Sequence, residues 1–237
     1  MIIANMATFP ARSEVLPDSL ARILPQVDKI NLCLNSYEKI PEYLCQPKIN
    51  AFIPDQDYRD VGKFVVNDFS DDDYILYMDD DLVYPEDYVS VLINEHEKYQ
   101  GFSPIIGVHG IIYPDVYDGQ VGCRVVFSFR QALKCSRVVN QLGTGTILCK
   151  GYQAAKLNYM LGSERFVDVR YSRYAYENGW PLICISRSFS WLDEVKYDET
   201  IFSTFTSKWP LEVIKECQYF SGYGKLSTDV SLLVEGF

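Results

Sequence analysis

The chain has 237 residues, and 48% of them are hydrophobic, which is enough to bury the core of one large α/β domain. It carries 32 acidic and 22 basic residues, for a net charge of −10. This excess of negative charge argues against a protein that binds the phosphates of nucleic acid or anionic lipid through clustered basic residues.

Cysteine usage and the N-terminal segment indicate a compartment. The seven cysteines are odd in number and include no Cys-x-x-Cys pair. Most stand in apolar runs, which is typical of reduced core cysteines and not of a disulfide frame or zinc site. The N-terminus "MIIANMATFP" lacks a basic region, and no run of about 18 apolar residues occurs in the chain. We expect a cytoplasmic protein without a transmembrane segment, and peripheral contact with the inner face of the membrane stays open.

Short apolar runs rich in β-branched residues predict the strands of a sheet. Those before residue 80 are apolar on both faces and alternate with helical stretches, a pattern typical of parallel strands that are covered on two sides. In chain order the predicted strands are 2–8, 30–36, 48–54, 73–79, 104–113, 123–129, 144–150 and 181–187.

The helical stretches complete the fold prediction. Pro85 suits the first position of a helix, and Gly179 suits the residue after a helix end. No repeat or low-complexity linker divides the chain, so we expect one domain over residues 1–237. Its fold class is α/β, a Rossmann-like α/β/α sandwich with a mainly parallel central sheet, whose function lies at the carboxyl ends of the strands. The predicted helices are about 13–24, 61–69, 85–98, 151–161, 167–178 and 209–220.

An acidic triplet ends the fourth predicted strand, in "YILYMDDDLVYPEDYV" (74–89). Residues two apart share a face of extended backbone, so Asp79 and Asp81 should point together and Asp80 away from them. Two convergent carboxylates repel unless a cation lies between them, and their hard oxygens suit Mg²⁺ or Mn²⁺. The alternative is a solvated turn whose acids favour the following helix N-terminus. For a second triplet, in "FSDDDY" (69–74), the solvated turn is the better interpretation.

Eight segments occur in a characteristic order along the chain. They are "MATFPAR" (6–12), "ILPQVDKINLCLNSY" (23–37), "DVGKF" (60–64), the triplet segment, "GVHG" (107–110), "LGTGTILCK" (142–150), "FVDVRYSRYAYENGWPLICISR" (166–187) and "SWLD" (190–193). This order resembles the A-type (GT-A) glycosyltransferases, close to glycosyltransferase family 2, and the resemblance extends to about residue 205. It implies a GT-A fold, a nucleotide-diphosphate sugar donor with UDP favoured, Mn²⁺ or Mg²⁺, and transfer to a hydroxyl of a glycan, a lipid-linked acceptor or another acceptor.

The same resemblance assigns residues to the donor. Asp79 and Asp81 would hold the metal, and Lys63 would contact the diphosphate. The alternatives are an ordinary turn before a helix for the 8–12 segment and a helix-surface lysine for Lys63. The residues expected to contact the nucleotide or its diphosphate are Thr8, Phe9, Arg12, Asn35, Asp60, Lys63, Asp79 and Asp80.

Asp168 opens a predicted helix, and in the resembling inverting enzymes an acid at this position removes the proton of the acceptor hydroxyl. Glu164 is the substitute, and a plain helix-start acid is the alternative for Asp168. His109 lies between glycines in an apolar strand, where a substrate or metal contact competes with a hydrogen-bonded core histidine. The segment 143–145 interrupts a strand and suggests a bulge beside bound sugar or acceptor. The predicted substrate contacts are His109, Gly143, Thr144 and Gly145.

Two other classes of function stay open. A nucleotidyltransferase would be supported by a glycine-rich phosphate loop after the first strand, and "ATFPAR" has no glycine. A catalytically silent binding module is disfavoured because Asp79, Asp81 and Asp168 occur together. The aromatic tail, about 206–237, is expected to form a lid over the donor or an extension on the acceptor side.

Overall fold

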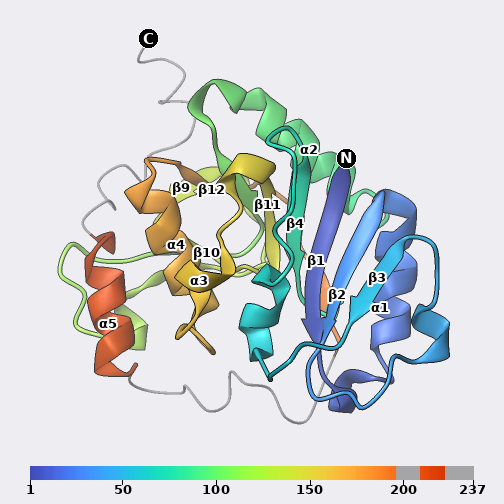
Figure 1. Cartoon of the computed structure of the whole chain (residues 1–237). Coiled ribbons are helices and arrows are strands. Elements are labelled where there is room, and N and C mark those ends of the chain that lie inside the picture. Colours follow the sequence, from blue (N-terminus) through green and yellow to red (C-terminus); the bar gives the residue numbers. More distant parts are fainter. Residues whose placement is uncertain (196–208, 222–237) are drawn as a thin grey trace.

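The computed structural model describes residues 1–195 and 209–221. Its centre is an eight-stranded sheet with the order β3-β2-β1-β4-β11-β6-β12-β9 (Figure 1). Four of the neighbouring pairs are parallel, namely β3–β2, β2–β1, β1–β4 and β6–β12, and the other three are antiparallel. The strands are β1 (Ile2–Thr8), β2 (Lys29–Leu34), β3 (Ile49–Phe52), β4 (Tyr74–Met78), β6 (Ile105–Gly107), β9 (Arg137–Val139), β11 (Thr146–Lys150) and β12 (Leu182–Cys184).

Helices cover both faces of this sheet. Alternate residues of β4 face opposite cores, because side chains of a strand alternate. Leu76 and Met78 pack with α1 (Leu16–Ile23) and α2 (Tyr88–Lys98), whereas Ile75 and Tyr77 pack with the 3-10 stretch η4 (Arg59–Phe64), α3 (Leu157–Met160) and α4 (Val167–Glu177). The α/β prediction with a mainly parallel sheet covered on both sides is therefore confirmed.

Smaller elements extend the sandwich. A three-stranded sheet is formed by β10 (Gln141–Leu142), β7 (Gly110–Ile112) and β8 (Val125–Phe127), and a two-stranded one by β13 (Asp193–Glu194) and β5 (Leu82–Val83). The predicted strand 104–113 is thus two strands, β6 and β7, in different sheets. The remaining 3-10 stretches include η1 (Pro10–Arg12), η2 (Leu24–Gln26), η3 (Glu42–Leu44), η5 (Gln100–Phe102), η6 (Val121–Cys123) and η7 (Gly151–Gln153).

Several predicted helices are shorter or tighter than expected. The stretch predicted at 61–69 is the 3-10 segment η4, and the stretch at 151–161 contains only η7 and the short helix α3. The first helix starts at Leu16, so that Pro17 lies in its first turn, where a missing N–H costs no hydrogen bond.

The helix α5 (Leu211–Gln218) packs beside α4 (Figure 1). Its Glu216 pairs with Arg170 at 2.6 Å and with Arg173 at 3.4 Å. Most of the predicted lid or acceptor-side extension, 206–237, lies outside the described residues. The prediction of one domain over residues 1–237 stays a prediction.

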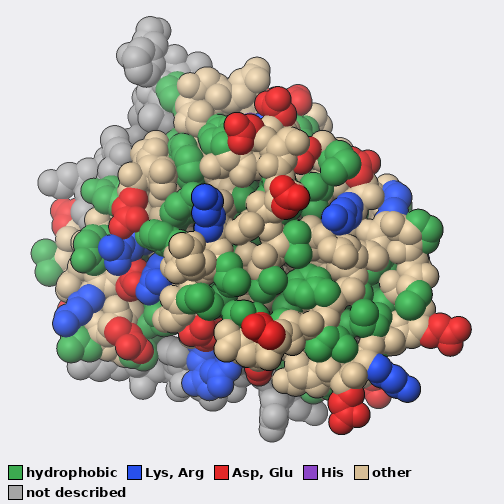
Figure 2. All heavy atoms as spheres, in the orientation of Figure 1, with side chains coloured by type: hydrophobic (Ala, Val, Ile, Leu, Met, Phe, Trp, Pro, Cys, Tyr) green, Lys and Arg blue, Asp and Glu red, His purple; other side chains and the backbone are tan. Residues whose placement is uncertain are grey.

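Cysteine placement and surface charge complete the picture. Four cysteines are buried and three are exposed, so the expectation that most lie in the core holds only for the first group: Cys33, Cys149, Cys184 and Cys217. On the face seen in Figure 2, acidic and basic side chains are interspersed. Within residues 1–195 and 209–221, no helix combines the length and apolar character needed to cross a bilayer.

One buried histidine makes the stability of this fold sensitive to acid. His96 in α2 is 3% exposed, and neither ring nitrogen has a hydrogen-bond partner among the described residues. Its ring lies edge-on to Tyr74, with the centroids 5.5 Å apart. Burial, with the nearby Lys150, lowers the pKa of His96 from 6.5 to about 4.

Because this pKa is lower in the folded state than in the unfolded state, the unfolded chain takes up the proton first. The contribution of neutral His96 to the free energy of unfolding is fully present above pH 6.5. It should be lost at up to about 1.4 kcal/mol per pH unit as the pH falls toward the pKa of the folded state. Urea unfolding at pH 7, 6 and 5 should show the stability of wild type falling relative to that of His96→Phe, with the larger change between pH 6 and pH 5. Parallel pH profiles for the two proteins would contradict it.

Candidate active site

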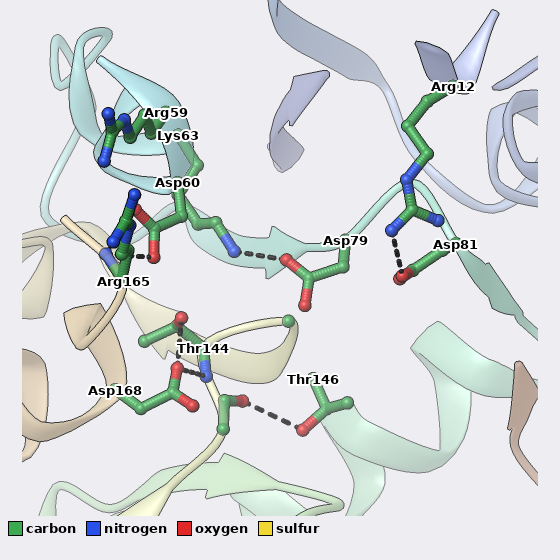
Figure 3. Close-up of polar contacts among 12 residues, drawn as sticks. Arg12, Arg59, Asp60, Lys63, Asp79, Asp81, Thr144, Thr146, Arg165 and Asp168 are labelled. Carbon is green, nitrogen blue, oxygen red and sulfur yellow. Dashed lines mark hydrogen bonds and ion pairs between the residues drawn. The ribbon is translucent and has the colours of Figure 1, made fainter. Parts of the chain in front are cut away.

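The candidate site lies where β1, β2 and β4 end on one edge of the sheet (Figure 3). Strand β11 runs antiparallel to β4, and its first residue, Thr146, pairs with Met78. The residues just before β11 therefore meet the residues just after β4. This register brings the 143–145 loop onto the acidic triplet, although about 65 residues separate them in the sequence.

The side chains of the triplet point to different partners. Asp79 Oδ1 forms an ion pair with Lys63 Nζ, and Asp81 Oδ2 lies 3.0 Å from an Arg12 guanidinium nitrogen. Asp80 is buried and accepts a 2.6 Å hydrogen bond from the Thr8 hydroxyl. Asp80 thus points away from its two neighbours, as alternation along a strand predicts. The repulsion between Asp79 and Asp81 is offset in this structure by one cation on each.

Burial raises the pKa values of two acids of the triplet, Asp80 and Asp81. It raises the pKa of Asp80 to about 6, while the Thr8 hydrogen bond and Arg12 act in the opposite direction. It also raises the pKa of Asp81, and Asp79 adds to that effect while Arg12 opposes it. A cation bound here would therefore favour the ionised forms of these carboxyl groups.

Lys63 is the cation at the centre of the site. It lies in η4 and is only 3% exposed, so the alternative of a surface lysine is wrong. Burial lowers its pKa, but Asp79, Asp168 and Asp60 together outweigh burial and raise it. Lys63 therefore stays protonated in a buried position that three carboxylates share.

Asp168 lies in the first turn of α4, and its charge acts on the pKa of Lys63. Its Oδ1 accepts hydrogen bonds from the Thr144 backbone N–H at 2.7 Å and from the Thr144 hydroxyl at 2.6 Å. Its Oδ2 has no hydrogen bond to a described residue. Burial raises the pKa of Asp168, and the Thr144 bonds and Lys63 oppose the shift. The structure thus holds one carboxylate oxygen by two hydrogen bonds, and the other has none from the described residues.

Two residues without a predicted role hold the 143–145 loop in place. The Tyr84 hydroxyl accepts the Asp79 N–H at 3.0 Å and lies 3.0 Å from the Gly145 carbonyl. The Thr146 hydroxyl donates to the Gly143 carbonyl at 3.0 Å. Gly145 has no room for a side chain, because an added Cβ would lie 1.9 Å from Asp79 Oδ2. Only the register of β11 against β4, a long-range feature, could have indicated these roles.

His109 lies against this loop. Its carbonyl accepts the Gly143 N–H at 2.9 Å, and an added Cβ on Gly143 would lie 3.2 Å from the His109 Cβ. Burial, with Arg187 and Arg124, lowers the pKa of His109 to about 4. Its Nδ1 is buried and has no hydrogen-bond partner among the described residues. The imidazole is therefore neutral at pH 7, and a contact of His109 with substrate stays a prediction.

The residues expected near the nucleotide differ in whether their side chains are exposed or are used on backbone groups of the protein. Phe9 is 39% exposed, and the Arg12 guanidinium lies 5.7 Å from its ring centroid. Asn35, by contrast, uses its amide on the backbone, donating to the Arg59 carbonyl at 2.8 Å and accepting the Tyr58 N–H at 3.0 Å.

Asp60 also has a partner in the backbone. Both of its carboxylate oxygens lie 3.0 Å from the Arg165 backbone nitrogen, and burial raises its pKa to about 6. Asn35 and Asp60 therefore hold loops in the structure, and a direct contact of either with a nucleotide stays a prediction.

The donor set at the triplet fits a hard divalent cation. The side chains of Asp79 and Asp81 are 46% and 29% exposed, and each uses one oxygen in its ion pair, which leaves the second oxygen for a metal. In the part of the chain that the structure describes, no group of three or more His, Cys, Asp or Glu residues is placed to hold a metal. Binding of Mg²⁺ or Mn²⁺ by Asp79 and Asp81 stays a prediction, and such an ion would need further ligands from a phosphate and water.

Comparisons with known proteins add little to this geometry. No protein-family model matches the chain, and no curated protein matches it. Among solved structures, the chain is similar to A197 from STIV, with 14% identity and a TM-score of 0.37 over 81% of each chain. The function is therefore argued from the residues of the site.

Gly145→Ala tests the contact between the loop and the triplet. The new methyl group would displace the Asp79 carboxylate, which is the mobile end of a partly exposed side chain, so the free energy of unfolding should change by about 1 kcal/mol or less. The affinity for Mn²⁺, measured by electron paramagnetic resonance, should fall by about tenfold, the effect of losing about 1.4 kcal/mol.

Gly101→Ala is the matched control, because an added Cβ there meets nothing within 4 Å. Equal Mn²⁺ affinities for the two variants would show that the Asp79 position does not matter.

Proposed function

We propose that this protein is a metal-dependent glycosyltransferase that moves a sugar from a nucleotide-diphosphate donor, with UDP favoured, to a hydroxyl of a glycan or glycoconjugate. One observation carries the proposal. Asp79, Lys63 and Asp168 come from three different elements, and their charges act on one another at the edge of the sheet. Such a set supplies a metal ligand, a cation for phosphate and a base within one site.

The donor side follows from the ion pairs. Asp79 and Asp81 would hold Mn²⁺ or Mg²⁺, which supplies positive charge to the diphosphate and to the oxygen on which charge develops. Lys63 would add a second positive charge beside Asp79. The exposed ring of Phe9 offers a stacking face for the base, and Arg12 lies between that ring and Asp81.

The acceptor side follows from Asp168. Its Oδ2 would take the proton of the acceptor hydroxyl while the hydroxyl oxygen forms a bond to the anomeric carbon. The bond between that carbon and the phosphate oxygen breaks, and the electron pair leaves with the nucleoside diphosphate. Attack from the face opposite the leaving group inverts the anomeric configuration. The raised pKa of Asp168 suits a base, because it strengthens the affinity of the carboxylate for the proton.

A panel of nucleotide sugars tests the proposal. Release of nucleoside diphosphate from at least one donor should require Mn²⁺ or Mg²⁺ and should stop in EDTA. Release that continues unchanged in EDTA would remove the metal from the mechanism. A complete lack of donor turnover and donor binding across the panel would contradict the function.

Asp168→Asn separates chemistry from binding. The amide oxygen can still accept both hydrogen bonds from Thr144, so the variant should fold. It cannot take up the proton, and transfer should fall by roughly 10²–10⁴-fold, the usual contribution of a positioned base. Donor affinity should stay within about twofold, because the base faces the acceptor.

The matched control for this experiment is Glu164→Gln. Glu164 accepts the Gly162 N–H at 3.2 Å and forms no hydrogen bond or ion pair with Lys63 or Thr144, so transfer should be unchanged. Near-normal transfer by Asp168→Asn, or loss of transfer in Glu164→Gln instead, would move the base to another residue.

A further inference from the structure

Two arginines stand at the rim of the candidate site without an ion pair. Arg59 is in η4 next to Asp60, and Arg165 is in the loop that leads into α4. Both are exposed, and neither guanidinium forms a salt bridge or hydrogen bond within the described part of the chain. Arg12, Arg170 and Arg173, in contrast, are paired with acids.

Buried side chains of the site bring these two arginines together. Asp60 binds the Arg165 backbone N–H with both carboxylate oxygens at 3.0 Å, and Asn35 binds the Arg59 carbonyl at 2.8 Å. Figure 3 shows both guanidinium groups on the Asp60 side of the site, away from Arg12. The main chains of residues 59 and 165 are therefore fixed relative to each other.

The backbone at both arginines is strained. Arg59 has a φ of 50° and Arg165 a φ of 76°, in the left-handed region that costs a non-glycine residue about 1 kcal/mol or more. Glycine or asparagine would adopt this conformation with less strain. The chain nevertheless presents an arginine at both positions, each held by a buried side chain.

The geometry points to an anion-binding subsite, formed by Arg59 and Arg165, that receives a phosphate or carboxylate group of the acceptor sugar. The inference rests on the proposed function and names its acceptor class, which is an acidic or phosphorylated sugar. The guanidinium fork binds both groups through paired hydrogen bonds. Arg165 lies three residues before Asp168, so an anion held there would place the acceptor beside the base. The donor diphosphate, in contrast, belongs with Asp79, Asp81 and Lys63.

Binding of small sugars tests the subsite without any need for turnover. Glucose 6-phosphate, glucuronate and glucose are titrated into the protein, and their affinities are measured by NMR. The charged sugars should bind about tenfold or more tightly than glucose, which corresponds to one charge-assisted contact. Comparing the affinities of glucose 6-phosphate and glucuronate shows whether the subsite prefers a phosphate or a carboxylate.

The double variant Arg59→Gln/Arg165→Gln should abolish the preference for charged sugars and leave Mn²⁺-dependent UDP binding intact. Arg22→Gln is the matched control, because Arg22 is an exposed arginine in the last turn of α1 and is not part of the proposed subsite. Equal binding of charged and neutral sugars, or a preference that survives the double variant, would overturn the inference. If the wild-type protein does not bind UDP, that result would contradict the proposed function instead. The sugar titration would still decide whether the two arginines bind anions.

Discussion

The arrangement of the site depends on how its negative charge is balanced. Asp60, Asp79 and Asp168 all act on the buried Lys63, and Asp81 depends on Arg12. Removing one of these charges would leave its partner uncompensated in a partly buried site. Replacing the positive charge of Lys63 or Arg12 by that of a metal ion should therefore cost less free energy than removing the charge altogether. That property suits a protein whose ligand brings its own metal and its own negative charge.

The sheet makes this balance possible. The first four strands in space, β3, β2, β1 and β4, are parallel and end on one edge, which places Thr8, Asn35 and Asp79 at similar depth. The reversed strand β11 then brings the 143–145 loop against the triplet from the other direction. Tyr84 and Gly145 fit these two segments to each other, one through hydrogen bonds and the other through its lack of a side chain.

Much of this could be predicted from local pattern. The doubly apolar strands before residue 80 predict the parallel half of the sheet, and alternation along a strand predicts that Asp80 turns away from Asp79 and Asp81. Both follow from the alternation of side chains between the two faces of a strand, a two-residue period that can be read in a sequence. The GT-A likeness and the roles that it assigns to individual residues stay predictions.

What could not be predicted depends on register and on long-range contact. The break between β6 and β7, the burial of Lys63 and the role of Tyr84 all require knowing which strand pairs with β4 and in which direction. Asn35 and Asp60 show the same limit. Each has a side chain suited to a nucleotide, and each uses it on a backbone group of a segment distant in the sequence.

The most direct test of this account is calorimetric titration of UDP into the protein with Mn²⁺ and with EDTA. The account predicts that Mn²⁺ strengthens UDP binding by about tenfold or more, since the acidic triplet should bind a diphosphate only through a cation. Asp81→Asn should remove most of that gain, because the metal would then lose a charged ligand. Equal UDP affinity in Mn²⁺ and EDTA would contradict the account.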